Sequence, residues 1–371
     1  MKKIGVITTQ YSPNYGALLQ TFALQKYLKK HYSEKEIEVI NYFPEHSKKF
    51  WDIFPNRKGW KNKLLAIYLF LHPQYIKAKK ERLSKLKKFV EDNISCSKAY
   101  SEYEELEQLE MEYDTLICGS DQIWNITRHD DPAWFLYFSK EWKECTKIAY
   151  APSVADKIPA GHEEHLKEYL QNLDFISVRE SSDIEQLKKY TSKEIWHVCD
   201  PVFLLSAQEW SEYFPKVDII KEPYILCYFI SAGDFAADVV KKIRNLTGIK
   251  VVYINVNIRD KFNADYDERI ADPADFVNYI KNARYVCTNS FHCTAFSILF
   301  KKDFLVVPKQ SANSRMKSMI DKAGIENRFI YKEKINDLNI QDLEVDYSKC
   351  NLEQWIKESK DYLNEAIEYN E

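Results

Sequence analysis

The sequence is poor in glycine and proline, with eight glycines and twelve prolines in 371 residues. This composition excludes collagen-like and low-complexity chains. Neither G-x-G-x-x-G nor a P-loop motif occurs, so dinucleotide sites and Walker-type nucleotide sites lack support. A G-x-S-x-G nucleophile elbow is also missing, which removes support for a hydrolase of that type.

Metal and disulfide patterns are missing as well. The eight cysteines form no C-x-x-C pair, and Cys118, Cys227 and Cys287 fall inside apolar β-type runs. His162 and His165 occur on a polar stretch without a partner cysteine or carboxylate pattern. We therefore expect reduced, buried thiols, no metal site and no cofactor, in a cytoplasmic protein.

Long apolar runs are absent too. The longest, residues 64–71, is far too short to cross a bilayer, and MKKIGVITTQ resembles a first strand more than a signal peptide. The formal net charge is only −3, but residues 48–88 hold thirteen Lys/Arg against two acids. This segment predicts either solvated helices with basic outer faces, the favoured reading, or peripheral contact with the inner face of an anionic membrane or a polyanionic acceptor. No nucleic-acid module accompanies it, so no nucleic-acid partner is expected.

Short apolar runs that end in polar turns alternate with stretches of helical spacing along most of the chain. This pattern predicts an α/β fold with parallel sheets. It restarts near residue 204, so we expect an N-terminal Rossmann-like domain at 1–203, with a basic helical insert at 48–92, and a second at 204–345. An amphipathic C-terminal helix is expected at 346–371.

Polar turns at strand ends are the candidate sites, because ligands of such sheets bind at the carboxyl ends of the strands. Each turn also has a structural interpretation. Asn14 and Gly16 form a turn that lets backbone approach a ligand or is simply tight. In the next turn, Gly119, Ser120, Asp121 and Gln122 are presented together; Asp121 is a candidate base, a ligand for sugar hydroxyls or a helix cap.

Two later turns carry charge. Arg179, beside Glu180, is placed to clamp a carboxylate or phosphate, or to pair with an acid of the protein. Asp200 is interpreted as a linker or cap residue. In TNSFHC, Ser290 is a candidate helix cap and His292 a candidate proton donor to a ligand that brings its own negative charge, or a core histidine.

Six segments in order resemble the polysaccharide pyruvyl transferase family: NYGALLQTFALQKYL, YDTLICGSDQIWN, KIAYAPSVA, DFISVRESS, CDPVFLL and TNSFHCTAFSILF. The resemblance covers roughly residues 1–325, including NSRMKSMIDKAGI with Arg315. It implies a GT-B-like architecture of two Rossmann-type domains facing a cleft, an acceptor side in the N-terminal domain and a donor side in the second.

The implied activity is transfer of a pyruvyl group from phosphoenolpyruvate to a sugar of a surface polysaccharide or its precursor, as a ketal. The acceptor would be a glycan or a lipid-linked sugar, as in exopolysaccharide synthesis. His292 matches the family's general acid and Arg179 the arginine that holds the donor. Asp121, the candidate base, is expected to complete the catalytic set. Substrate binding is expected from Asn14, Gly16, Gly119, Ser120, Gln122, Ser153, Glu180, Ser290 and Arg315.

Two positions depart from the family pattern. Ser290 stands where members commonly have arginine, and Cys293 where glycine is usual. We expect Arg315 or Arg284 to supply the missing charge. Two alternatives stay open: a GT-B-type glycosyltransferase that uses a nucleotide sugar, with residues 311–316 contributing, and a non-catalytic glycan-binding protein.

Overall fold

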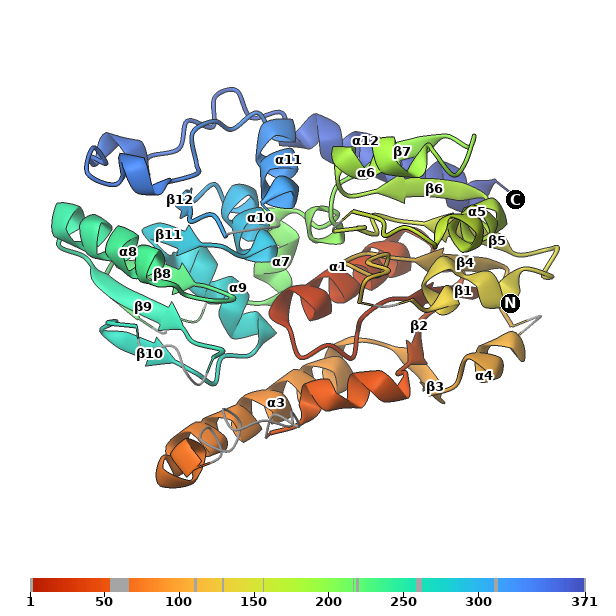
Figure 1. The fold of residues 1–371 in the computed structure, drawn as a ribbon, viewed down its shortest axis with the longest axis horizontal. Helices are drawn as coiled ribbons and strands as arrows, with labels where there is room; N and C mark the ends of the chain where they lie inside the picture. Colours follow the sequence, from red (N-terminus) through yellow and green to blue (C-terminus); the bar gives the residue numbers. More distant parts are fainter. Residues whose placement is uncertain are drawn as a thin grey trace.

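The computed structural model describes residues 3–53, 67–109, 112–128, 130–155, 157–215, 217, 220–257, 262–309 and 313–369. Two parallel sheets lie side by side in it, each covered by helices (Figure 1). Every strand pair is parallel, so the predicted α/β fold with parallel sheets is confirmed.

The first sheet has seven strands in the order β3-β2-β1-β4-β5-β6-β7. Its strands are β1 Lys3–Ile7, β2 Glu36–Tyr42, β3 Cys96–Tyr100, β4 Thr115–Cys118, β5 Thr146–Ala149, β6 Phe175–Val178 and β7 Ile195–His197. The α-helices between these strands are α1 Tyr15–His31, α3 Pro73–Asn93, α4 Tyr103–Glu107, α5 Glu163–Asn172 and α6 Ser181–Leu187. Short 3₁₀ helices are η1 Glu45–Trp51, η2 Pro132–Phe135, η3 Tyr137–Ser139 and, after β7, η4 Pro201–Phe203.

The second sheet has five strands in the order β10-β9-β8-β11-β12. They are β8 Tyr224–Tyr228, β9 Lys250–Ile254, β10 Tyr266–Glu268, β11 Tyr285–Thr288 and β12 Asp303–Val306. The helices are α7 Ala207–Tyr213, α8 Asp234–Thr247, α9 Pro273–Asn282, α10 Phe291–Leu299 and α11 Ser314–Lys322, followed by η5 Lys332–Lys334 and η6 Gln341–Leu343. We call the two units the N-terminal and C-terminal domains; the exact boundary at 203/204 stays a prediction.

Helix α1 begins the structure that positions the site. Asn14 caps it by accepting a hydrogen bond from the Gly16 N–H at 2.9 Å, as expected for an Asn N-cap. The helix lies between the two sheets in Figure 1 and is buried along most of its length. Its Tyr15 ring stacks on Phe276 of α9 at 4.8 Å, and the Tyr15 hydroxyl donates to the Ala271 carbonyl. One apolar core therefore runs through both domains and fixes the cleft between them.

Helix α12, Leu352–Glu368, returns to the N-terminal domain. Its Tyr362 hydroxyl donates to the Ala149 carbonyl of β5 at 2.9 Å, and its Ser359 hydroxyl accepts from the Cys199 N–H at 2.8 Å. The expected C-terminal helix thus exists but begins at Leu352, not at 346, because residues 344–351 are an extended connection and a turn.

The expected basic insert at 48–92 is described in part: η1 ends at Trp51, α3 begins at Pro73, and 54–66 lie outside the described residues. Cys118, Cys227 and Cys287 are buried in strands as predicted. None of the helices in the described part of the chain has both the length and the apolar character that a bilayer-spanning helix requires.

Candidate functional site

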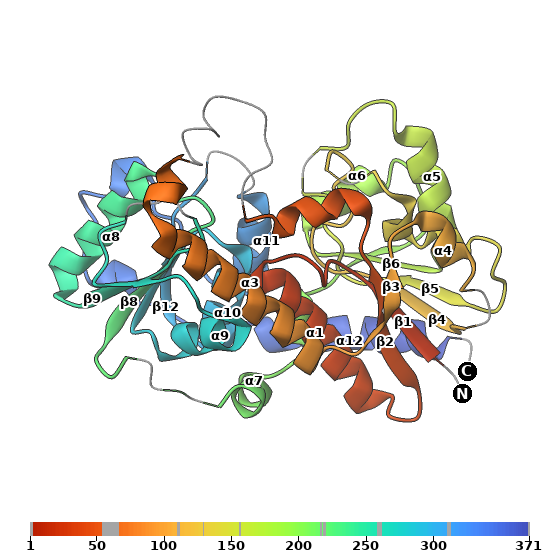
Figure 2. The ribbon, with the colours of Figure 1, turned by 90° about the horizontal axis from the view of Figure 1, so that it is seen from below.

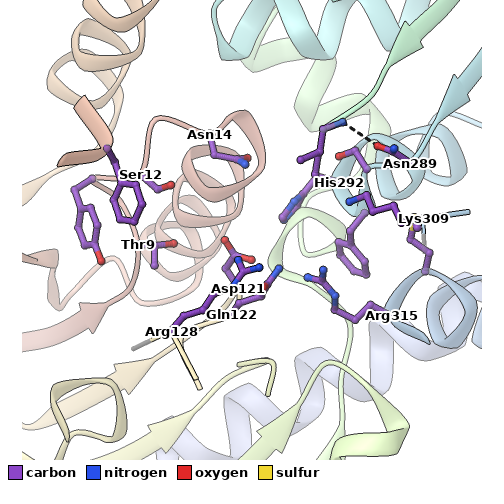
Figure 3. Close-up of a pocket in the computed structure, with 16 residues that line it drawn as sticks. Thr9, Ser12, Asn14, Asp121, Gln122, Arg128, Asn289, His292, Lys309 and Arg315 are labelled. Atoms are coloured by element: carbon purple, nitrogen blue, oxygen red, sulfur yellow. Dashed lines mark hydrogen bonds between the residues drawn. The ribbon is translucent and has the colours of Figure 1, made fainter. Parts of the chain in front are cut away.

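A cavity of about 210 Å³ lies between the domains, at the carboxyl ends of β1, β4, β8, β11 and β12 (Figure 3). This is the position that a parallel α/β sheet offers to a ligand. The lining residues are Thr9, Tyr11, Ser12, Asn14, Phe50, Asp121, Gln122, Arg128, Ile230, Asn289, Ser290, Phe291, His292, Lys309, Arg315 and Met316.

His292 enters the cavity from the first turn of α10, which begins at Phe291. Ser290 caps this helix by accepting from the Cys293 N–H at 3.4 Å, so the predicted serine cap is confirmed. The imidazole reaches across the cleft to α1. A methyl group at Gly16 would lie 2.0 Å from Nδ1 of His292, so this position must stay a glycine for the ring to fit. Gly16 therefore admits the histidine ring, where the sequence suggested approach of a ligand.

Asp200 is the residue around which the buried polar groups gather. Its Oδ2 atom lies 2.6 Å from Nη1 of Arg179 and 3.5 Å from Nε2 of His292. The Ser120 hydroxyl oxygen lies 3.4 Å from the same oxygen, and the Val202 N–H donates to Oδ1 at 3.1 Å. Burial alone would raise the pKa of Asp200, but His292, Arg179 and the hydrogen bond from the Val202 N–H hold that pKa well below its usual range. Asp200 does cap η4, as predicted, yet it also supplies a permanent negative charge behind His292.

Arg179 is fully enclosed and does not line the cavity. Besides Asp200, its guanidinium pairs with Glu180 at 3.3 Å and with Asp121 at 3.6 Å, and it lies 4.3 Å from the centre of the Phe291 ring. Burial opposes its charge, but the three carboxylates outweigh burial and raise the pKa of Arg179. The structure thus shows the pairing with acids of the protein; the role of Arg179 in holding the donor stays a prediction.

Glu180 and Ser153 lie behind Arg179. The Ser153 hydroxyl donates to Glu180 Oε2 at 2.7 Å, and both side chains are buried away from the cavity. Asp183, in the first turn of α6, accepts from the Val154 N–H at 2.9 Å. Burial, followed by the neighbouring Glu180 carboxylate, raises the pKa of Asp183 to about 9, so its carboxyl group is protonated at neutral pH.

In the turn after β4, the first two residues are buried behind the cavity and the next two line it. Gly119 has φ +145°, and a Cβ there would lie 1.9 Å from the Tyr150 carbonyl oxygen, so only glycine fits. Ser120 is buried, and its hydroxyl donates to the Ala151 carbonyl at 2.8 Å. Asp121 and Gln122 reach the cavity (Figure 3), where the Gln122 amide oxygen, in its favourable orientation, accepts from Nη2 of Arg315 at 3.0 Å.

Three cations line the same cavity: Arg128 from the N-terminal domain, and Lys309 and Arg315 from the C-terminal domain (Figure 3). None of them forms a salt bridge with a carboxylate among the described residues. Burial, then repulsion from Arg315 and Arg128, lowers the pKa of Lys309 to about 8, and burial, then repulsion from Arg179, lowers the pKa of Arg315. Cations that repel one another around one cavity favour binding of an anion there.

Arg284, the other candidate for the missing charge, lies at the wrong end of the sheet. It precedes β11, whereas the cavity lies beyond the end of β11, and it forms an ion pair with Asp303. The expectation that Arg284 supplies charge to the site is therefore wrong. Arg315 is in place, because α11 follows β12 and begins beside the cavity.

The predicted site residues thus fall into two groups. Those that line the cavity are Asn14, Asp121, Gln122, Ser290, His292 and Arg315. Those buried behind it are Gly16, Gly119, Ser120, Ser153, Arg179 and Glu180. Sequence reasoning missed Arg128 and Lys309; Lys309 follows β12, and its position after a strand was the available signal. Of the segment 311–316, residues 311 and 312 lie outside the described residues, and no cluster of metal ligands occurs among the described ones.

Two parallel α/β domains, a ligand-sized cavity between them and a last helix that returns to the first domain define a GT-B-like architecture. Solved structures agree with this fold. The S. aureus MnaA–UDP co-structure has a TM-score of 0.52 and 15% identity, covering 98% of this chain and 97% of that one. The Methanocaldococcus jannaschii UDP-GlcNAc 2-epimerase, in complex with UDP-GlcNAc and UDP, has a TM-score of 0.52 and 10% identity, covering 98% and 100%. At such identities the likeness establishes the fold alone.

The amino-acid sequence, unlike the fold, identifies the family. A family model described as polysaccharide pyruvyl transferase matches residues 14–310. The chain therefore belongs to the polysaccharide pyruvyl transferase family, as its motifs indicated, and the family supports a transferase. No curated protein matches the chain.

Proposed function

We propose that the protein transfers a pyruvyl group from phosphoenolpyruvate to a sugar of a surface polysaccharide or its precursor. The observation that carries this proposal is the set of three cations, Arg128, Lys309 and Arg315, gathered around His292 without carboxylate partners among the described residues. Phosphoenolpyruvate carries a carboxylate and a phosphate on a three-carbon unit, so it can contact several cations at once.

The size of the cavity also favours a small donor. Its volume of about 210 Å³ is below the roughly 300–1,000 Å³ of pockets that hold drug-sized ligands. Phosphoenolpyruvate is compact enough for such a space, whereas a nucleotide sugar would need the domains to separate or the ligand to extend beyond the cavity.

His292 would act as the general acid. The imidazolium donates a proton to the methylene carbon of the donor, which becomes a methyl group and leaves an oxocarbenium-like centre at the neighbouring carbon. Asp200, ionised and 3.5 Å from Nε2, stabilises the imidazolium before the transfer. A first sugar hydroxyl attacks the cationic carbon and a second displaces phosphate. The hydroxyl protons leave to Asp121, to the neutral imidazole or to the departing phosphate, so the ketal forms without a separate cofactor.

Lys309 and Arg315 would replace the arginine that Ser290 lacks. Ser290 is occupied as the cap of α10, so it cannot hold a phosphate as a guanidinium would. Lys309 and Arg315 lie in the same domain as Ser290 and line the same cavity. The acceptor sugar would contact the N-terminal wall, where Thr9, Ser12 and Asn14 offer hydrogen-bonding groups and Phe50 offers an apolar face.

The test is calorimetry of phosphoenolpyruvate binding to the wild type and to Arg315→Gln, Lys309→Gln and His292→Asn. Each lost charge-assisted contact should weaken binding about 10- to 100-fold in the first two variants. Arg284→Gln is the matched control, because it removes an arginine paired with Asp303 outside the cavity and should bind like the wild type. His292→Asn should keep binding within about tenfold but lose transfer.

Failure of the wild type to bind phosphoenolpyruvate, with binding of UDP instead, would overturn the proposal in favour of a nucleotide-sugar donor. The S. aureus and M. jannaschii structures that share the fold contain UDP, which makes UDP the appropriate competitor. Binding of a glycan with no donor bound at all would favour the non-catalytic alternative.

A further inference from the structure

Residues 67–93 form a surface arm, consisting of a short helical turn at 67–71 and helix α3. In Figures 1 and 2 the helix begins beside the C-terminal domain and runs along one face of the molecule, past α1, toward β3. Leu83, Leu86 and Phe89 are buried, and the Phe89 ring lies 5.9 Å from Phe22 of α1. The inner face of the arm is thus part of the core, and this packing turns the opposite face of α3 toward solvent.

Both domains hold the arm. Arg269 lies 4.7 Å from the centre of the Tyr75 ring, and Lys85 lies 3.8 Å from Asp275. The Lys79 ammonium donates to the Asp52 carbonyl at 2.7 Å, just beyond η1, whose Phe50 lines the cavity. The arm is therefore rigidly connected to the rim of the candidate site.

The outer face of the arm is basic. Lys77, Lys80, Ser84, Lys87 and Lys88 are exposed at spacings of three and four residues, the period of one helix face, and Glu81 is the exposed acid among them. Lys77 and Lys80 form no ion pair among the described residues, whereas Lys87 and Lys88 have only the exposed partners Glu91 and Asp92. This face presents positive charge to whatever approaches it.

The beginning of the arm is apolar. Phe70 is 81% exposed, Leu71 67% and Ile67 56%, whereas Leu69 between them is fully buried and anchors the turn. Among the described residues, three of the five most exposed large apolar side chains thus fall within five consecutive positions. Single exposed apolar residues are ordinary, but a cluster next to a basic stripe marks an interaction surface.

We propose that this arm docks the protein on the surface of an anionic lipid bilayer. Phe70, Leu71 and Ile67 would enter the boundary between headgroups and acyl chains, and Lys77, Lys80 and Lys87 would contact lipid phosphates. A soluble polyanion would use the lysines but would leave the apolar cluster in water, so the bilayer satisfies both features of the arm. If the proposed function is correct, docking would also bring the cavity beside the membrane, where a lipid-linked acceptor is found.

The test is co-sedimentation of the full chain with vesicles of phosphatidylcholine containing about 30% phosphatidylglycerol. The wild type should bind these vesicles and bind pure phosphatidylcholine vesicles far more weakly. The triple variant Lys77→Gln/Lys80→Gln/Lys87→Gln should bind about 100-fold more weakly, at about fivefold per lysine near the surface. Phe70→Ser/Leu71→Ser should also lose binding, even at low salt.

The matched control is Lys143→Gln/Lys188→Gln/Lys189→Gln, which removes the same charge from exposed positions of the N-terminal domain and should bind like the wild type. All variants should keep wild-type thermal unfolding and phosphoenolpyruvate affinity, so failure of this proposal is distinguishable from failure of the proposed function. Equal binding of the lysine variant and the wild type would overturn the proposal. Binding to heparin without binding to vesicles would overturn it in favour of a soluble polyanion.

Discussion

The His292 ring fills the space that a side chain at Gly16 would need, although the two residues stand at the starts of two helices in different domains. A methyl group at Gly16 would lie 2.0 Å from Nδ1 and 2.3 Å from Cγ of the ring. The imidazole is therefore positioned by the absence of a side chain on the facing helix. The position of the proposed acid thus depends on the packing of α1 against the C-terminal domain.

Gly16→Ala should displace the ring and lower the rate of transfer about 100-fold, because a displacement of about 1 Å at a reacting group has that effect. Helix α1 itself should tolerate the change, since alanine favours helix. Steady-state kinetics is the measurement, and Gly233→Ala is the control, because a Cβ at Gly233 meets no atom within 4 Å. Wild-type turnover in Gly16→Ala would show that the ring position does not matter.

Lys309 should make donor binding depend on pH. Its pKa is lowered to about 8, so the ammonium loses its proton as the pH rises through 8, and the anion site loses a charge. Affinity for phosphoenolpyruvate should therefore fall above about pH 8, by up to about tenfold per unit, until the pKa of the bound state is reached. Calorimetry from pH 7 to 10 measures this. Lys309→Arg should remove the pH dependence and keep the binding; a slope that persists in this variant would place the titrating group elsewhere.

Removing only one partner of the Arg179–Asp200 pair should lower the free energy of unfolding more than removing both. Arg179→Met leaves the Asp200 carboxylate buried without its nearest cation, and we expect a loss of about 3–5 kcal/mol in the free energy of unfolding. Arg179→Met/Asp200→Leu should recover most of this stability while transfer stays low, since His292 then lacks its carboxylate. Urea unfolding followed by linear extrapolation is the measurement.

Lowering the pH should remove the stability that the Arg179–Asp200 pair contributes. Because the pKa of Asp200 is depressed in the folded state, its contribution is present above about pH 4 and is lost as the pH falls further. In the urea experiment, an Arg179→Met variant that unfolds at the same urea concentration as the wild type would contradict the expected cost of breaking the Arg179–Asp200 pair.

Asp183→Asn should stabilise the protein at alkaline pH. The raised pKa means that folding keeps Asp183 protonated, so its contribution to stability is greatest below about pH 4 and declines as the pH rises toward about 9. An asparagine can accept from the Val154 N–H and donate to Glu180, as the protonated acid does, without this decline. We expect a clear gain in stability at pH 8 and little change at pH 4, measured by chemical unfolding. A loss of stability at pH 8 would indicate that Asp183 is ionised.

Much of the fold and part of the site could be predicted from the sequence. Alternation of short apolar runs with helical spacing implies parallel strands, and the carboxyl ends of such strands meet at one edge. That rule predicts that Asp121 and His292 lie near a common ligand site, and both line the cavity. It could not show which acid neutralises Arg179, because the dominant partner, Asp200, is 21 residues away and the pairing depends on the contact between β6 and β7. Lys309 is one lysine among many in the sequence, and only the position of α11 gives it Arg315 as a neighbour.

The return of α12 to β5 has a consequence for the order of assembly. Trp355, Tyr362 and Leu363 are buried in the core shared with the N-terminal domain, yet they follow the whole C-terminal domain in the chain. During synthesis from the first residue onward, the surface of β5 that Tyr362 covers stays open until the C-terminal domain has been made. The first domain to begin folding is therefore the last to be completed, and the C-terminal domain is topologically an insertion within it.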